Sequence, residues 1–593
     1  MRRAALKSLL VALVARTAGG LLQPPVCFDL DQDVSVDQQV CWELPANYTY
    51  ELGSLNATID GRLRTSSPFS LPCFSNYNGI SVDRDEQLCS QIQTNYRNHA
   101  FRVDSFSSSM NPQYETCIAT GSQCLLDWRN PRNPEANNGI SCELGGVAEF
   151  YIDVHNPGDV QAAYLFAAKT NTPLSIKNTG HDFMGRSHRR GSLGLWTHNL
   201  DAMTYHPAFT PESCDDSGSF RAITVGAGVT FDQVYKFAHD NDVLFIGGYS
   251  QSVGVSGGWL MGGGHGVLSP VFGLGVDRVL QIKIVTPDGE YRTANACQNP
   301  DLFWALRGGG GGTFGVVLES THLVEPNIPI QIANISYNPA PAQQREFFEI
   351  LVNDSVRWAG LGWGGHANRR GLVYMNPLLS PTEAQESMGN MTAFARSHGG
   401  SVNFNTLPWY DFFERYITEE QAPVGTLVTL GSRLIPKANF QTEAGRAQLV
   451  ELLIKQSAAL GFPNIIPLAG TPMSRLGVPG ETSVTPKWRS ALWHLVTTAW
   501  WNYNSTLEEI RGTYGRVHDM VQEMRKVAGP DSGVYMNEGD VYETNHEEAY
   551  WGENYARLVQ VKRKYDPLGL LACWNCIGSQ GAAAFPCYPR LDV

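Results

Sequence analysis

One histidine stands in a setting that suits close contact with a ligand. His181 lies in the run NTGHD, residues 178–182, a glycine turn directly after a short apolar run that ends near Ile176. A second glycine-rich stretch covers 253–266 and a third covers 307–317. Glycine permits positive φ and has no Cβ, so backbone N–H groups can close around an anion such as a pyrophosphate. Three such loops and a presented histidine predict a large phosphate-containing cofactor, bonded covalently to the chain.

Acid–base side chains gather in the run VYMNEGD, residues 534–540. As a strand, this run would place Tyr535 and Asn537 on one face and Glu538 and Asp540 on the other, so only one set could face a ligand. A carboxylate against a flat ligand and aromatic rings would have its pKa raised by desolvation, which suits proton transfer near neutrality. We expect Glu538 to be the catalytic residue, with Asp540 and Tyr535 behind it. The alternative is a solvated acidic loop.

His494 is a further catalytic candidate. It lies in ALWHLVTTAWW, residues 491–501, which is predicted to be a strand that could line a pocket. A histidine buried in the core with satisfied hydrogen bonds is the simpler interpretation.

The only CxxC, Cys573 to Cys576, has neither a second CxxC nor a thioredoxin-like βαβ unit around it, so structural pairing is favoured over zinc or redox chemistry. The sequence therefore predicts no metal site.

Two motif matches are disfavoured, one to a serine hydrolase and one to a nucleotide-binding loop. Residues 254–258 fit the G-x-S-x-G pattern of a serine-hydrolase elbow, but the pattern is short and the region is saturated with glycine. The run RGGGGGTFG, from Arg307, lacks the G-K-[ST] of a P-loop and does not complete G-x-G-x-x-G. A cradle for a large phosphate-containing cofactor would explain the neighbouring GGGHG, whereas a hydrolase would not.

Five segments, in this order, resemble the vanillyl-alcohol-oxidase superfamily and, within it, the fungal berberine-bridge-enzyme-like FAD-linked oxidases. They are NTGHDFMGRS (178–187), GGGHGVLSPVFGLGVDRVL (262–280), NPDLFWALRGGGGGTFGVV (299–317), VYMNEGD (534–540) and YWGENYARLVQVKRKYDP (550–567). The resemblance runs from about Gly145 to the C-terminus and is weaker in the middle. It implies an α+β fold: a PCMH-type FAD-binding domain in two parts, a substrate domain with an antiparallel sheet covered by helices, and a C-terminal segment that returns to the FAD domain.

The resemblance also implies the cofactor and its contacts. His181 matches the histidine that bonds the 8α-methyl of the flavin. The family often adds a cysteine bond from a C-P-T-V-G motif, but Ser250 stands at that position, and a hydroxyl cannot replace the thiolate. We therefore expect FAD with a single covalent link, through His181. The other expected cofactor-binding residues are Asn178, Thr179, Gly180, Asp182, Gly185, Arg186, Ser187, Ser250, Val253, Gly254, Gly257, Gly258, Gly262, Gly264, His265, Gly266, Asp277, Gly315, Val317, Asn554 and Tyr555.

The 593 residues are too many for one core. Apolar residues at 160, 163, 164 and 167, and again at 231, 234, 235 and 238, have the spacing of a helix face. The run 280–294 predicts a hairpin that turns at 287–289. We predict five parts: a signal peptide (1–19), a cysteine-rich extension (20–144), the FAD domain (145–326), the substrate domain (327–545) and a C-terminal segment that completes the FAD domain (546–593).

Charge and cysteine content limit the partners and the compartment. The net charge of −13 argues against nucleic acid or an anionic membrane as the main partner. A basic start and a seven-residue apolar run predict a signal peptide, and the run is too short to span a bilayer. Twelve cysteines suggest disulfides and support a secreted or vesicular protein. Six glycosylation sequons add modest support: Asn47, Asn56, Asn334, Asn353, Asn390 and Asn504.

Three functions are consistent with these features. The first is an FAD-linked oxidase of a specialised metabolite, such as an alkaloid or polyketide–peptide hybrid, that passes hydride to flavin N5 and electrons to O₂, with H₂O₂ as a product. The second is a redox-neutral double-bond isomerase with Glu538 as general acid. The third is an inactive carrier, against which the complete cradle argues. In each case we expect a small-molecule partner, and a monomer or weak oligomer.

Overall fold

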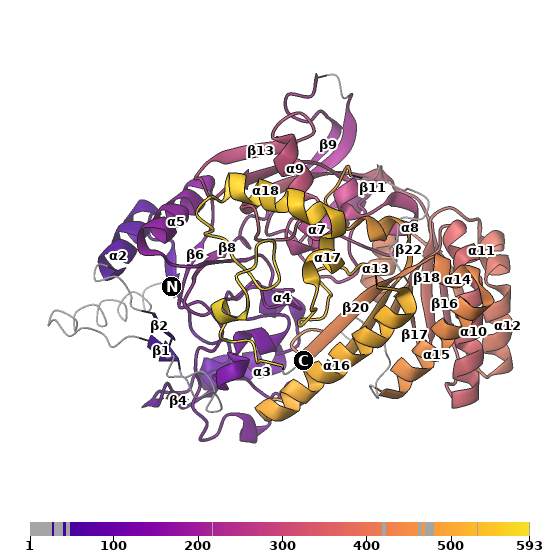
Figure 1. Ribbon diagram of the computed structural model, residues 1–593, viewed down its shortest axis with the longest axis horizontal. Coiled ribbons are helices and arrows are strands. Elements are labelled where there is room, and N and C mark those ends of the chain that lie inside the picture. The colour runs from indigo at the N-terminus through magenta and orange to yellow at the C-terminus, as the bar shows by residue number, and fades with distance from the viewer. Residues whose placement is uncertain are drawn as a thin grey trace.

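The computed structural model describes residues 26–28, 40–42, 48–215, 218–417, 423–459, 465–468, 480–530 and 532–591. The expected signal peptide, 1–19, lies outside these ranges. Within them the chain has an α+β fold, with the predicted FAD domain and the predicted substrate domain side by side (Figure 1). No helix in the described ranges is both long enough and apolar enough to cross a bilayer.

The first sheet of the predicted FAD domain carries the loop with His181. Its strand order is β3 (Leu63–Thr65), β6 (Phe150–Asp153), β8 (Leu193–Trp196) and β7 (Leu174–Lys177). Both β6 and β7 run parallel to β8, so the chain needs a crossover after β6. Helix α5 (Pro157–Thr170) provides that crossover and begins with a capping box between Asn156 and Asp159. The apolar face predicted for this helix is buried.

A second, antiparallel sheet of five strands supports the other glycine loops. Its order is β13 (Tyr291–Asn295), β12 (Val279–Val285), β14 (Val316–Leu323), β10 (Phe220–Gly226) and β9 (Met203–Phe209). The predicted hairpin is β12–β13, and Gly289 takes φ +84° at its turn. Helix α6 (Phe231–Asp240) buries the predicted apolar face, and the short helix α7 (Gly258–Met261) follows the second glycine cluster.

The predicted substrate domain is an antiparallel sheet with helices packed on it. Five strands lie in the order β19 (Ser401–Leu407), β16 (Ile330–Ser336), β18 (Gly371–Asn376), β17 (Gly364–Asn368) and β21 (Ile465–Leu468). Two long strands, β20 (Val428–Pro436) and β22 (Ala491–Trp500), form a separate pair beside them. Helices α10 (Pro341–Gly360), α12 (Gly389–Ser397) and α15 (Glu443–Ala459) cover the larger sheet, and α16 (Leu507–Ala528) runs along β20 and β22 (Figure 1).

Both ends of the described chain pack on the predicted FAD domain. At the N-terminal side, α2 (Tyr48–Thr58) packs on α5, and β3 pairs with β6. At the C-terminal side, α17 (His546–Trp551) and α18 (Tyr555–Tyr565) follow the substrate domain, and Lys564 of α18 pairs with Asp301 of α9 (Pro300–Leu306). The predicted return of the C-terminal segment to the FAD domain is therefore confirmed.

Disulfides hold the two terminal segments in place. Cys73 pairs with Cys89 and Cys124 with Cys142 in the N-terminal segment, and Cys214 pairs with Cys297 beside the second sheet. Cys117 pairs with Cys587 across 470 residues, which joins the N-terminal segment to the C-terminal one. Cross-linking so distant a pair removes much conformational entropy from the unfolded chain.

Candidate active site

The glycine loops surround one large cavity. It encloses about 1250 Å³ of space, part of which is open to solvent. The loops after β7, before α7 and before β14 converge on it. The predicted cofactor-binding residues that line it are Asn178, Thr179, Gly180, His181, Asp182, Arg186, Ser187, Val253, Gly254, Gly257, Gly258, Gly315 and Val317.

The lining fits a large cofactor with hydrogen-bonding groups. Gly258 faces the cavity, and a Cβ at this position would have no heavy atom within 4 Å. The backbone is therefore open to close approach by a ligand. Asn178 donates to the carbonyl of Ala227, but its buried Oδ1 has no hydrogen-bond partner among the described residues. An unpaired buried acceptor is costly, so Asn178 offers a ready contact for a ligand donor.

His181 lies in this cavity with one ring nitrogen already engaged. Its Nε2 is 2.6 Å from Ser252 Oγ, which leaves Nδ1 for another contact. Burial, with a smaller effect from His99, lowers the pKa of His181 to about 3, so the imidazole is neutral at physiological pH. A neutral imidazole has the free lone pair that a nucleophile needs. The serine that contacts His181 is therefore Ser252, not Ser250, which stands at the position of the family's cysteine.

Some predicted cofactor-binding residues do not line the cavity and instead position its loops. Asp277 pairs with Arg489 of the substrate domain at 2.6 Å. Asn554 Nδ2 donates to the carbonyl of Val484, and Tyr555 Oη accepts from the N–H of Gly578. Close packing of loop on loop explains the glycines: a Cβ on Gly266 would lie 2.0 Å from the carbonyl oxygen of Gly247. The remaining residues of this set are Gly185, Ser250, Gly262, Gly264 and His265.

The run 534–540 is a turn, not a strand, and this changes which side chains share a face. Tyr535, Asn537 and Glu538 all line the cavity, whereas strand alternation predicted that Tyr535 and Glu538 would point to opposite faces. Asn537 Nδ2 donates to the hydroxyl of Tyr535 and to the carbonyl of Gly258, both at 2.7 Å. These bonds fix the turn against the glycine loop.

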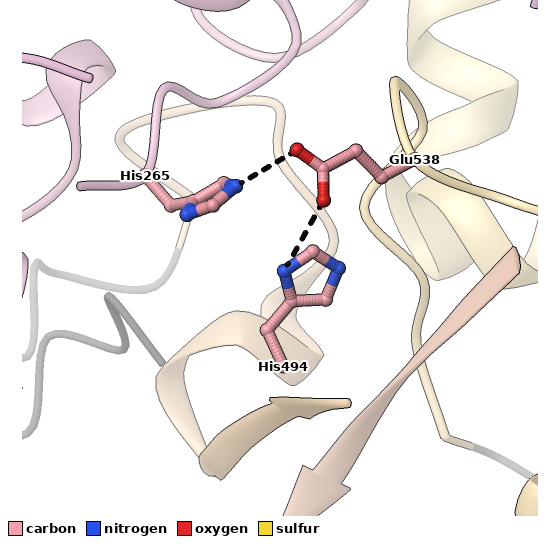
Figure 2. Close-up of side chains that lie close together, drawn as sticks. All are labelled: His265, His494 and Glu538. Carbon is pink, nitrogen blue, oxygen red and sulfur yellow. Dashed lines mark hydrogen bonds and ion pairs between the residues drawn. The ribbon is translucent and has the colours of Figure 1, made fainter. Parts of the chain in front are cut away.

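Glu538 meets two histidines from distant segments (Figure 2). His265 Nε2 lies 3.3 Å from Oε1, and His494 Nδ1 lies 3.8 Å from Oε2. Burial works against ionisation of Glu538, but the hydrogen bond and charge of His265, with His494 and His366, lower its pKa to about 2. The prediction of a raised pKa is therefore wrong, because the histidine neighbours outweigh desolvation. Glu538 is a carboxylate at neutral pH, so it can accept a proton but has none to donate, and its low pKa makes it a weaker base than one matched to neutrality.

The other two catalytic candidates differ in their surroundings. His494 is fully buried on β22 beside Glu538, and burial lowers its pKa to about 3. Asp540 does not line the cavity: its Oδ2 lies 2.5 Å from Nδ1 of His518 on α16. This bond raises the pKa of His518. Asp540 therefore holds α16 to the turn and lies outside the cavity lining.

Two neighbours of the Glu538 cluster, Trp488 and His366, gave no sequence signal. The ring of Trp488 packs near that of His265, with centroids 6.1 Å apart. His366 of β17 lies close enough to Glu538 and His265 for their charges to affect its pKa. These contacts join segments up to 273 residues apart, so no local spacing could have indicated them.

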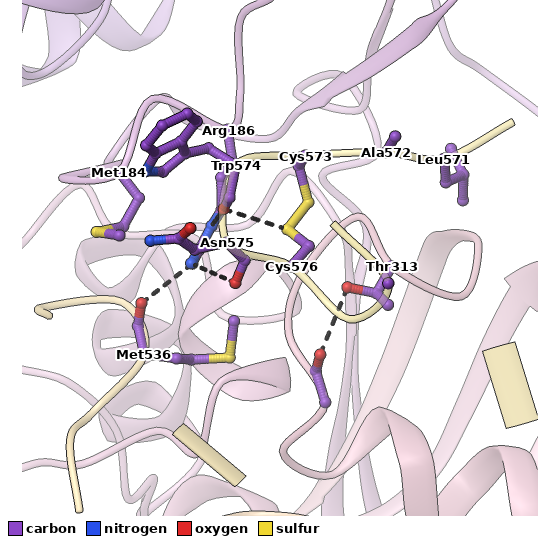
Figure 3. The surroundings of a disulfide bond; sticks show 12 residues. Met184, Arg186, Thr313, Met536, Leu571, Ala572, Cys573, Trp574, Asn575 and Cys576 are labelled. Carbon is purple, nitrogen blue, oxygen red and sulfur yellow. Dashed lines mark hydrogen bonds between the residues drawn. A yellow bond between two sulfur atoms is a disulfide. The ribbon is translucent and has the colours of Figure 1, made fainter. Parts of the chain in front are cut away.

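The CxxC forms the predicted structural disulfide, and it borders the cavity (Figure 3). Cys573 is a lining residue. Arg186 Nε donates to the carbonyl of Trp574, between the two cysteines, and its Nη1 donates to the carbonyl of Met536. Arg186 thereby ties the cradle to both the disulfide loop and the Glu538 turn. The serine of the G-x-S-x-G pattern, Ser256, is fully buried, and its hydroxyl shares a hydrogen bond with Ser320. This hydroxyl is therefore not exposed as the nucleophile of a serine hydrolase would be.

Comparison with known proteins agrees with this geometry. A model of the FAD binding domain matches residues 148–295, and a model described as "Berberine and berberine like" matches 534–573. The FAD-linked oxidoreductase ffsJ of Aspergillus flavipes is 42% identical over 569 residues, covering 89% of this chain and 92% of the relative. The FAD-linked oxidoreductase OXR2 of Pyricularia oryzae is 40% identical over 536 residues, covering 88% and 91%.

Solved structures of similar fold include a VAO-type flavoprotein, MtVAO615, from Myceliophthora thermophila. It has a TM-score of 0.79 and 24% identity, with 93% of this chain and 97% of that chain covered. A glucooligosaccharide oxidase from Acremonium strictum has a TM-score of 0.60 and 19% identity, covering 73% and 91%. Fold, cradle and relatives therefore agree that this chain is an FAD-binding enzyme and belongs to the berberine-bridge-enzyme-like FAD-linked oxidoreductases.

Proposed function

We propose that this protein is an FAD-linked oxidase of a specialised metabolite, with Glu538 as general base and FAD bonded covalently to His181. The observation that supports this most is the position of the Glu538 carboxylate, which lines the cavity 3.3 Å from Nε2 of His265. FAD, when bound, accepts hydride from the substrate and returns the electrons to O₂, which gives H₂O₂.

Glu538 removes the proton that accompanies hydride loss. Its carboxylate is ionised throughout the physiological range, so it is ready to accept a proton from a substrate O–H, N–H or C–H group. Tyr535 is held as a neutral phenol, since burial raises its pKa, and it shares a hydrogen bond with Asn537. The phenol can position a polar substrate atom without competing for the proton.

Two features support the single covalent link. The neutral imidazole of His181 keeps Nδ1 free for a bond while Ser252 holds Nε2. Among the residues that line the cavity, the only cysteine is Cys573, whose sulfur is in a disulfide. A thiolate for a second bond is therefore missing from the lining.

The isomerase alternative is less well supported. Acid catalysis needs a protonated Glu538, whereas the neighbouring histidines lower the pKa of this carboxyl. The partners we propose are a small-molecule substrate and O₂, with the protein acting as a monomer or weak oligomer. The disulfides among the described residues support folding in the secretory pathway.

Anaerobic flavin reduction tests the oxidase proposal. Purified holoenzyme is mixed with a panel of fungal metabolites, and bleaching of the flavin absorbance is recorded. A substrate should bleach the wild-type flavin, and Glu538→Gln should slow bleaching roughly 10²–10⁴-fold, the usual contribution of a general base. A product of unchanged mass, formed without bleaching, would instead establish the isomerase.

A further inference from the structure

The cluster at Glu538 has the composition and spacing of a metal site. The donor atoms of His265, His494 and Glu538 all lie within 4.8 Å of one another. The closest pairs are 3.3 and 3.8 Å apart. Ligand atoms around a tetrahedral Zn²⁺ are separated by roughly 3.4 Å, given metal–ligand bonds of about 2.0–2.2 Å. Figure 2 shows the three side chains pointing toward one another from separate segments.

An independent feature is a buried histidine with unused nitrogens. His494 is 0% exposed, and neither of its ring nitrogens has a hydrogen-bond partner in the described part of the chain. Such an unpaired group costs about 1–3 kcal/mol, and native proteins pair most of them. Its Nδ1 points to the carboxylate of Glu538, so a cation between them would contact both.

Access and ligand identity favour a divalent transition metal. Glu538 lines the cavity, and the side chains of His265 and Glu538 are 16% and 23% exposed, so an ion can enter from the cavity. Two imidazoles and one carboxylate are the ligands of zinc sites with an open position and of non-haem iron sites. Calcium and magnesium prefer sites made only of oxygen ligands.

We propose that His265, His494 and Glu538 bind one divalent transition-metal ion of the Zn²⁺ class, and that the bound ion inhibits the oxidase. Inhibition follows because a metal-bound carboxylate of Glu538 cannot accept the substrate proton. The inhibitory effect rests on the proposed function, whereas binding of the ion does not. The cluster would then couple the enzyme's activity to the free metal concentration around it.

A direct titration tests binding. Holoenzyme is stripped with a chelator, transferred to metal-free buffer and titrated with Zn²⁺ in competition with a chromophoric chelator. We expect one Zn²⁺ per chain. Glu538→Gln, which preserves the side-chain shape, and His494→Gln should each weaken binding at least about 100-fold, because loss of an outer-shell partner alone costs 10–100-fold. His155→Gln is the control, since the side chain of His155 is half exposed and pairs with Asp153.

Each outcome is decisive once flavin absorbance and melting temperature show that a variant is folded. Absence of stoichiometric Zn²⁺ binding to wild type, or equal binding by wild type and Glu538→Gln, would overturn the site. Zn²⁺ binding that depends on these residues but does not slow flavin reduction by substrate would leave the site standing and contradict the inhibition. Slower reduction in wild type, restored by the chelator, would support both parts.

Discussion

The replacement Glu538→Gln gives a stability test of the active-site electrostatics that needs no substrate. Burial opposes the charge of Glu538, but His265, then His494 and His366, bring its pKa from 4.5 to about 2. At about 1.4 kcal/mol for each pKa unit, that difference sets an upper limit of ~3 kcal/mol on the stability gained at neutral pH, because His494, whose pKa is about 3, is uncharged there. Since the folded pKa lies below the unfolded one, the stabilisation is complete above pH 4.5 and is lost as the pH falls toward 2.

Glutamine keeps the shape of the side chain and removes its charge, so the variant should lack this stabilisation at pH 7. With an unfolding entropy of about 2.1 cal/mol/K for each residue, ~3 kcal/mol lowers the melting temperature by roughly 2–3 °C if all 593 residues melt together. The drop is larger if the substrate domain melts by itself. Thermal melting followed by flavin fluorescence, with a chelator present, measures this difference.

The control for that experiment is Glu386→Gln. Glu386 is an exposed carboxylate on α11 (Pro381–Ser387), so the melting temperature should stay the same. If Glu538→Gln were as stable as wild type at pH 7, or more stable, the carboxylate would be strained rather than stabilised by its histidines. Our assignment of Glu538 as an ionised base would then be refuted.

Three other predictions concern the cradle and its supports. Gly258→Ala should fold but bind less FAD, because the added Cβ enters the cavity. Gly315→Ala should fail to fold, because its Cβ would lie 2.4 Å from the carbonyl oxygen of Val285. Flavin content and the yield of folded protein measure both effects. Replacing both cysteines of the Cys573–Cys576 disulfide by serine should destabilise the protein by about 2 kcal/mol, from the entropy of a four-residue loop. The same change should lower flavin occupancy, because Arg186 bonds the carbonyl of Trp574 in this loop. Full flavin occupancy would contradict this role of Arg186. Asp540→Asn should lower the melting temperature more at pH 5.5 than at pH 8.5. Asp540 raises the pKa of His518, so the pair stabilises the folded protein fully below pH 6.5 and loses this effect as the pH rises through the folded pKa. An equal drop at both pH values would refute the charged pair.

The sequence predicted the cradle better than the catalytic side. The cradle residues lie in short motifs on loops, so His181 and several of the glycines could be placed from these motifs and the resemblance they carry, although Gly185, Gly262, Gly264 and Gly266 lie outside the cavity lining. The turn at 534–540 could not, because the sequence left both a strand and a solvated loop open there, and a bond from Asn537 to the distant Gly258 holds it as a turn.

Long-range packing explains the remaining differences. The pKa of Glu538 depends on His265 and His494, which reach it from other parts of the chain. Asp277 looked like part of a cofactor motif, yet its partner, Arg489, lies 212 residues later. Motif spacing carries information about a single loop, and it contains none about which loop from the other domain will pack against it.

The most direct test of the account is in-gel flavin fluorescence of denatured protein, with wild type and His181→Ala compared from the same flavin-replete host. We predict a fluorescent band for wild type and none for the variant, since Ser250 offers no second attachment point. A wild-type band that stays dark while free FAD appears in the supernatant would contradict the covalent link through His181. A fluorescent band that persists in His181→Ala would place the link on another residue.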